Sequence, residues 1–137
     1  MDNNKHNLKG SDSRDTFKHM HKNLNKKFYS LDLDFIWIEK NPPGIVACID
    51  YKRKEDHITF SECIAYNQIM RVFPVYILED VRGDMVSFNI KKYMGGDWRP
   101  EPPQIELKPI LTKVTWQEFE QWQMSLRSLY KQGKDLR

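Results

Sequence analysis

One run of residues constrains the fold of this chain more than any other. Residues 45–52 read IVACIDYK, an apolar run that contains neither Gly nor Pro. Such a run is typical of a strand that is buried on both faces of a sheet, so the chain must supply neighbouring strands and layers that cover both faces. Because side chains alternate along a strand, Asp50 and Lys52 at its end project to the same face.

The segments on either side of this run predict an α/β fold. Residues 31–39 are rich in Phe, Ile and Trp, and the Pro-Pro-Gly that follows predicts a turn, so an antiparallel hairpin is expected. A helix over 59–71, capped at Thr59 or Ser61, and a buried strand over 73–78 come next. A helix between two buried strands predicts that these strands lie parallel.

The C-terminal part of the chain predicts a further strand and a helix. Residues 86–93 alternate apolar and polar side chains, which favours an edge strand, and residues 94–103 predict an irregular loop. An extended segment over 105–112 is followed by a helix over 115–131, whose first residues have the spacing of a capping box.

The N-terminal part is expected to contribute a tail and a helix. Residues 1–13 are polar, so they predict a disordered tail. From Ser13 onward, apolar side chains recur at helical spacing, and Lys18, Lys22 and Lys26 form a basic stripe beside them. A length of 137 residues fits one domain, which we place at residues 14–137. The apolar helix face consists of Phe17, Met20, Leu24 and Phe28.

Composition excludes some functional classes. Apolar residues make up 39% of the chain and charged residues 30%, and no apolar run is long enough to span a membrane or serve as a signal peptide. Cys48 and Cys63 lie in apolar segments without the spacing of a disulfide framework or a zinc site. These features favour a cytoplasmic protein, and the net charge of +3 is a weak indication of an anionic partner.

The candidate chemistry lies where the hairpin brings two carboxylates together. Asp34, near the start of the first strand, is expected to lie level with Asp50, near the end of the second. Neighbouring carboxylates repel unless a cation lies between them, and oxygen ligands of this kind suit Mg²⁺, with Mn²⁺ as a substitute. The carbonyl of Tyr51 can supply another oxygen, and Lys52 is placed to orient or deprotonate an attacking water. Asp32 is an alternative ligand that faces the same way as Asp34.

This arrangement resembles the PD-(D/E)xK superfamily, which includes restriction endonucleases, Holliday-junction resolvases and RecB-like exonucleases. Asp34 matches the first acidic position, and Asp50-Tyr51-Lys52 matches the (D/E)xK element. Glu62 and Tyr66 have the spacing of the Gln-x-x-x-Tyr motif of the RecB-like branch. Three departures are Glu62 in place of Gln, Leu33 in place of Pro, and the absence of Glu before Glu39, which leaves His21 or Asp15 as the nearest helix candidate.

The resemblance implies a restriction-endonuclease-like fold, in which helices flank a mixed central β-sheet and a C-terminal helix follows. It also implies a metal-dependent nuclease that hydrolyses phosphodiester bonds of DNA or RNA. Asp34 and Asp50 would bind the metal, Lys52 would activate water or stabilise the phosphate, and Glu62 would assist. Candidate nucleic-acid contacts are Lys22, Arg53, Lys54, Tyr66, Trp98 and Arg99.

Other interpretations of the same residues remain open. Asp50 and Lys52 can also belong to a solvated hairpin end with a salt bridge, and Trp98 can cover an edge of the domain. The chain would then be a catalytically inactive nuclease-fold module that binds nucleic acid or protein, or an interaction module with no nucleic-acid role. The Trp-rich C-terminal helix is expected to contribute to the core or to the interface of a homodimer.

Overall fold

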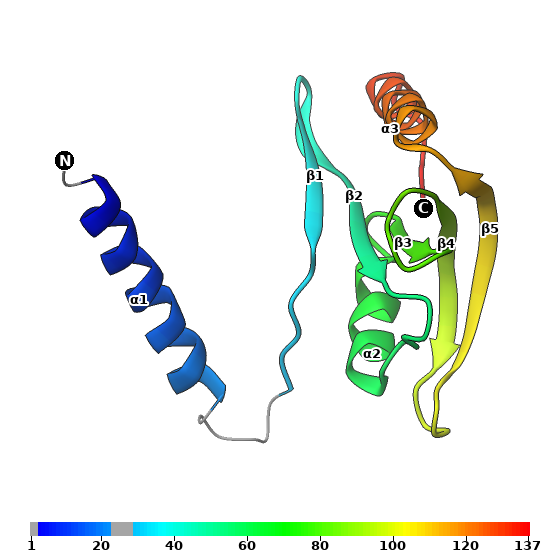
Figure 1. The fold of residues 1–137 in the computed structure, drawn as a ribbon. Helices are drawn as coiled ribbons and strands as arrows, with labels where there is room; N and C mark the ends of the chain where they lie inside the picture. The colour runs from blue at the N-terminus through cyan, green and yellow to red at the C-terminus, as the bar shows by residue number, and fades with distance from the viewer. Residues whose placement is uncertain (1–2, 23–28) are drawn as a thin grey trace. The chain divides into compact units, whose positions relative to one another are not determined.

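The computed structural model describes residues 3–22 and 29–137, with side chains from Asp12 onward in these ranges. The chain divides into two units, Met1–Ser30 and Leu31–Arg137, whereas the sequence placed the domain boundary after residue 13. The first unit contains helix α1 (Asn3–Lys22), and the second contains a five-stranded mixed sheet with two helices (Figure 1). The described chain is therefore an α/β protein, as predicted. Among its described helices, none has the length and apolarity needed to cross a bilayer.

Helix α1 differs in extent from the helix that the sequence predicted. It begins at Asn3 rather than at Ser13, and so includes residues assigned to a disordered tail. Residues 3–13 offer few large apolar side chains, and nothing in their sequence explains a helix there. Farther along, the rings of Phe17 and His21 stack with centroids 5.9 Å apart. Leu24, Lys26 and Phe28 lie outside the described residues.

The predicted hairpin is confirmed as strands β1 (Phe35–Lys40) and β2 (Pro43–Lys52), which pair antiparallel. Strand β1 begins at Phe35 rather than at residue 31. The reason lies in Asp34, whose side-chain Oδ2 accepts the Tyr51 N–H at 2.7 Å. A carboxylate thus takes the donor that a longer β1 would bond through its backbone, so regular pairing stops there.

Helix α2 (Phe60–Ile69) and strand β3 (Val75–Asp80) complete the predicted β-α-β unit. Thr59 is the N-cap, and it forms a full capping box with Glu62. Strand β3 pairs parallel with β2, as predicted, with Asp50 opposite Ile77.

The prediction that residues 86–93 form an edge strand is wrong. Strand β4 (Phe88–Asp97) lies between β3 and β5 (Gln104–Val114), and it extends into the first four residues of the predicted 94–103 loop. Its polar side chains are tolerated on an inner strand because neighbouring strands satisfy them. Asn89 and Lys91 both bind Glu79, at 3.2 Å each.

The two faces of the sheet have separate cores. On one face, α3 (Trp116–Lys131), whose predicted capping box is present, packs Trp122 and Leu126 against Ala47 and Ile49 of β2. On the other face, Cys63 and Tyr66 of α2 pack against Cys48. Successive side chains of β2 thus point alternately into the two cores, which is why its sequence is apolar almost throughout.

Helix α3 also fixes the β1–β2 hairpin. The Trp37 ring lies against Trp122, with ring centroids 5.9 Å apart, and the Tyr130 hydroxyl donates to the carbonyl of Pro42 at 3.1 Å. Gly44 leaves room for this contact, because a Cβ there would lie 2.1 Å from the Tyr130 hydroxyl oxygen and would displace the ring. The turn therefore cannot move without disturbing α3.

The C-terminus returns to the sheet. The Lys92 ammonium donates to the carbonyl of Leu136 at 2.9 Å, and the Arg137 guanidinium donates to the carbonyl of Arg71 at 2.9 Å. Burial lowers the pKa of Lys92, as expected for an amine held beneath another part of the chain. The last residues are thereby tied both to β4 and to the end of α2.

Asn67 joins α2 to the end of β4. Its amide Nδ2 donates to the Gly96 carbonyl at 3.0 Å, and its Oδ1 accepts from the Gly96 N–H at 3.1 Å and from the Tyr93 hydroxyl at 2.6 Å. Tyr93 is fully buried, so its hydroxyl depends on such partners within the protein. A helix residue of ordinary appearance in the sequence thus holds the helix on the sheet.

We predict that Asn67→Ala lowers the free energy of unfolding by about 1–3 kcal/mol, because it removes the shortest hydrogen bond of the buried Tyr93 hydroxyl and both bonds to the Gly96 backbone. Urea denaturation followed by circular dichroism measures this loss. The matched control is Gln68→Ala, at the next residue, which is exposed and bonds only to Arg71. Equal stability of the two variants would contradict the assigned role.

Candidate metal centre

The candidate site is a pair of matched contacts between the end of β2 and one face of α2. Asp50 and Lys52 are two residues apart on the strand, and Tyr66 and Glu62 lie one turn apart on the helix. The Tyr66 hydroxyl donates to Asp50 Oδ2, and the Lys52 ammonium pairs with Glu62 Oε2. The structure thus brings together the residues of both sequence motifs.

Asp50 is a buried carboxylate, with 3% of its surface exposed. It accepts the Tyr66 hydroxyl on one oxygen and the Asp34 N–H on the other, at 3.3 Å. The pKa of Asp50 is raised to about 6, mainly by burial and also by the neighbouring Asp34, while the bond from Tyr66 and the charge of Lys52 act in the opposite direction. The site therefore holds a carboxylate that its surroundings keep from ionising easily.

Asp34 completes the pair of carboxylates. It lies immediately before β1 and is exposed, with its Oδ2 held by the Tyr51 N–H at 2.7 Å. Its own N–H bonds to Asp50, so both the backbone and the side chain of Asp34 engage the end of β2. Asp32, the alternative ligand, is also exposed, but these bonds connect Asp34 to the site.

Lys52 is held by an acid that is itself fixed. Its side chain is 14% exposed and that of Glu62 is 13% exposed. While Oε2 of Glu62 pairs with Lys52, Oε1 accepts the N–H of the helix cap Thr59 at 3.0 Å. Each oxygen of Glu62 therefore has a different partner, and the start of α2 sets where the ammonium lies.

Tyr66 binds Asp50 from within the core beneath α2. The residue is fully buried, and its ring meets that of Tyr93 edge to face with centroids 5.2 Å apart. Burial and the nearby Asp50 raise the pKa of Tyr66, so the hydroxyl remains a donor. In this position Tyr66 orients a carboxylate rather than contacting a nucleic acid, the role first considered for it.

Two carboxylates are the acidic groups that the site offers to a metal. Within residues 3–22 and 29–137, no group of three or more His, Cys, Asp or Glu side chains is placed to hold an ion. The pair nevertheless suits a hard divalent cation, because Mg²⁺ commonly uses one or two carboxylates and completes its shell with waters and substrate oxygens. The raised pKa of Asp50 points the same way, since a cation beside it would offset the cost of its charge. Tyr51 contributes its N–H to Asp34, and a role for its carbonyl stays a prediction.

The predicted nucleic-acid contacts lie mainly outside this cluster. Arg53 is paired with Asp56 at 3.2 Å, and Arg99 is paired with Asp97 at 2.9 Å on its own loop. Lys54 and Trp98 are exposed. Lys22 belongs to α1, in the N-terminal unit.

A groove that the sequence did not reveal adjoins the site. It has a volume of about 310 Å³, and Asp34 is one of its lining residues. Its floor is formed by the buried Ile49 and Leu78, and the exposed aromatic rings of Phe35 and Trp116 lie along it. The Trp116 indole is fixed by donating to the Met85 carbonyl at 2.9 Å. No local pattern signals this groove, because its walls come from five separate parts of the chain.

We predict that Asp50→Asn stabilises the metal-free protein near neutral pH by about 1–3 kcal/mol. Folding raises the pKa of Asp50 from 3.8 to about 6, so the stability linked to its proton is present below pH 4 and is lost as the pH rises through 6. The side-chain oxygen of Asn can still accept the Tyr66 hydroxyl, but the residue carries no negative charge. Urea titrations at several pH values in a chelator should show a gain at pH 8 that shrinks toward pH 4, and a gain independent of pH would contradict this explanation.

Comparison of the chain with models of protein families, with curated proteins and with solved structures found no match. The functional argument therefore rests on the residues just described. Its central elements are the carboxylate pair of Asp34 and Asp50, the ammonium group of Lys52, and the two α2 side chains that hold them.

Proposed function

We propose that the chain is a metal-dependent nuclease of the PD-(D/E)xK type, with a restriction-endonuclease-like sheet, acting on DNA or RNA in the cytoplasm. One observation carries the proposal: the backbone N–H of Asp34 donates to the Asp50 carboxylate at the end of β2, and Lys52 lies two residues farther along the strand, paired with Glu62. A salt bridge at a hairpin end needs only one acid and one base. The second carboxylate, held next to a buried first one, favours a cation site.

Asp34 and Asp50 are the residues that would hold a divalent ion, and Mg²⁺ or Mn²⁺ fits their oxygen donors. When bound, such an ion polarises a phosphate and lowers the pKa of water. Asp50 is positioned by Tyr66 and Asp34 by the Tyr51 amide, so neither side chain must reorganise to meet it. This preorganisation is typical of a site built for binding.

Lys52 would serve the phosphate or the attacking water. In the absence of substrate its charge is balanced by Glu62. A phosphate that enters the site competes for the ammonium, and Glu62 remains anchored through its bond from Thr59. Lys52 can then stabilise the charge that develops on the phosphate oxygens, while Glu62 limits where the ammonium can move.

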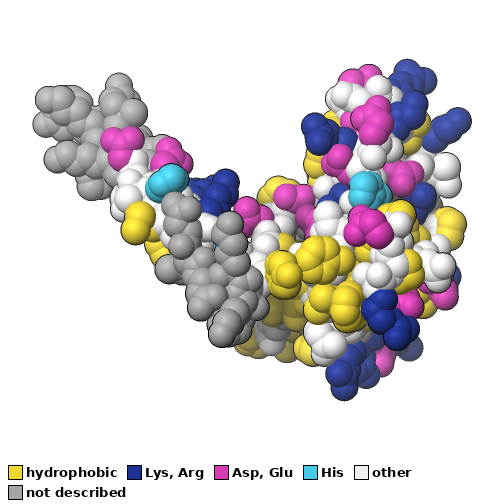
Figure 2. All heavy atoms as spheres, turned by 90° about the horizontal axis from the view of Figure 1, so that it is seen from below, with side chains coloured by type: hydrophobic (Ala, Val, Ile, Leu, Met, Phe, Trp, Pro, Cys, Tyr) yellow, Lys and Arg dark blue, Asp and Glu magenta, His cyan; other side chains and the backbone are white. Residues whose placement is uncertain are grey.

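The surroundings support a nucleic acid as substrate. Arg53 and Lys54 follow the site directly in the chain and are exposed, which suits contacts to a phosphate backbone. The groove beside Asp34 offers exposed aromatic rings on which a base can stack. Figure 2 shows Lys and Arg side chains on the surface of the unit Leu31–Arg137, interspersed with Asp and Glu.

We predict that the protein cleaves DNA or RNA only with Mg²⁺ or Mn²⁺, and that Asp50→Asn and Lys52→Met each reduce cleavage at least a hundredfold. The assay uses single- and double-stranded substrates of both nucleic acids. Asp84→Asn, which alters a carboxylate in the exposed loop before β4, is the matched control and should retain activity. Unchanged cleavage by Asp50→Asn would overturn the proposal.

Calorimetry with Mn²⁺ separates the competing functions. A nuclease should bind the ion, and Asp34→Asn and Asp50→Asn should each abolish the binding. Absence of metal binding, together with salt-dependent binding of an oligonucleotide, would instead indicate an inactive nuclease-fold module. Absence of both would indicate an interaction module without a nucleic-acid role.

We also predict that Tyr66→Phe weakens Mn²⁺ binding roughly tenfold, because removal of a side chain that orients a metal ligand typically costs this much or more. The substitution keeps the aromatic ring that packs on Tyr93, so the fold should persist. Titration of Mn²⁺ into the variant, with its melting temperature as a control, tests the role. Unaltered affinity would show that Tyr66 only fills the core.

A further inference from the structure

The two edges of the sheet differ in how well they are protected against pairing. The sheet order is β1-β2-β3-β4-β5, so β1 and β5 are its edges. Exposed sheet edges offer unpaired backbone groups to other strands, and proteins commonly protect them with charges, Pro and bulges. Strand β5 has all three: Lys108, Pro109 and Lys113 lie along it, and its register with β4 shifts repeatedly.

Strand β1 has less of this protection in its centre, where its register with β2 shifts once, between Trp37 and Ile38. Ile36, Trp37 and Ile38 follow one another without a charge or Pro, and Ile38 is 73% exposed. Ile45, opposite Ile38 on β2, is exposed as well. Ile36, Ile38 and Ile45 thus form an exposed apolar strip along this edge, on the face of the sheet away from α3.

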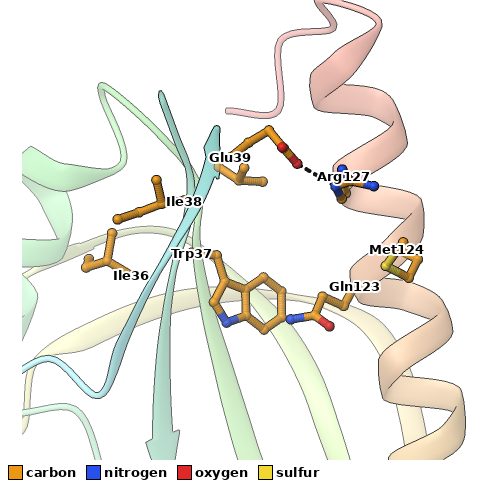
Figure 3. Close-up of a pocket in the computed structure, with 8 residues that line it drawn as sticks. Ile36, Trp37, Ile38, Glu39, Gln123, Met124 and Arg127 are labelled. Carbon is orange, nitrogen blue, oxygen red and sulfur yellow. Dashed lines mark hydrogen bonds and ion pairs between the residues drawn. The ribbon is translucent and has the colours of Figure 1, made fainter. Parts of the chain in front are cut away.

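A cavity continues this apolar surface on the other face. It has a volume of about 340 Å³ and lies between β1 and α3, as Figure 3 shows. Trp37 and Val46 line it from the sheet, and Met124, half exposed, lines it from the helix. At one end the ion pair of Glu39 and Arg127, 2.5 Å long, crosses from strand to helix. Its lining residues are Ile36, Trp37, Ile38, Glu39, Val46, Gln123, Met124 and Arg127.

We propose that this edge binds β1 of a second copy of the chain, antiparallel and about a twofold axis at Trp37. The sequence argues for this occupant, because the charges at the two ends of the strand are opposite, so that two antiparallel copies place each one against its complement. Asp34 precedes the apolar centre and Lys40 follows it. Antiparallel pairing about Trp37 sets each Asp34 opposite a Lys40 and each Ile36 opposite an Ile38, whereas parallel pairing would set like charges together.

The edge is already fixed in a conformation that can pair. Helix α3 holds the hairpin through the Trp37 ring, through the bond from Arg127 to Glu39, and through the Tyr130 hydroxyl at the turn. Pairing would therefore cost little ordering of the strand. It would also bring Met124 of the two copies to the same side of the joined sheet, beside the two cavities.

Asp34 also belongs to the proposed metal site, but the interface requires neither an ion nor a substrate, so it is tested without metal or nucleic acid. Sedimentation equilibrium of the full chain should show a dimer. Ile38→Lys places a charge in the centre of the interface and should raise the dissociation constant at least tenfold. The matched control is Val72→Lys, at an equally exposed apolar residue outside β1, which should dimerise as the original chain does. Melting curves confirm that both variants are folded.

A second measurement tests the register. Cys48 and Cys63 are buried, and burial raises the pKa of Cys48 to about 12, so neither competes with a new surface thiol. Under mild oxidation, a mixture of Ile36→Cys and Ile38→Cys chains should form a covalent dimer, because these positions face each other across the axis. Each variant alone should cross-link far less.

Three results would overturn the proposal. The first is a chain that stays monomeric at all concentrations, and the second is a dimer of unchanged affinity in Ile38→Lys. The third is equal cross-linking of each cysteine variant with itself and with the other, which would exclude the twofold axis at Trp37.

Discussion

The arrangement of this protein depends on one costly interaction, the burial of the Asp50 carboxylate at the end of β2. A buried charge persists only where partners compensate for lost hydration. Here the partners are the Tyr66 hydroxyl and the Asp34 amide, which come from α2 and from the start of β1. To supply them, the hairpin must be in register and α2 must cross the sheet at the right height. The site and the fold therefore specify each other.

Much of this was readable from the sequence because it depends on local patterns. The apolar run at residues 45–52 predicted the inner strand, the Pro-Pro-Gly turn predicted the hairpin, and the spacing of Thr115 and Glu118 predicted the start of α3. The closeness of Asp34 and Asp50 followed from the alternation of side chains and the length of the turn. Each of these inferences needed only residues that are near in the chain or joined by one tight turn.

The parts that could not be predicted depend on partners distant in the chain. The alternating polar residues of β4 suggested an edge strand, but Glu79 of β3 satisfies Asn89 and Lys91 on an inner one. Nothing in the sequence around Asn67 indicates its partners Gly96 and Tyr93, which lie 29 and 26 residues farther along the chain. Glu62 matched a motif, yet its actual partners are a helix cap and Lys52. Periodicity reports which face a residue occupies, and it carries no information about what lies opposite.

The way the chain ends has a practical consequence for anyone handling the protein. Leu136 and Arg137 are bonded to Lys92 and to the carbonyl of Arg71, so the final residues are a fastened part of the structure. A purification tag or fluorescent fusion attached there would pull on β4 and on the end of α2. Such additions are better placed at the N-terminal side, which belongs to a unit separate from the one that contains the sheet.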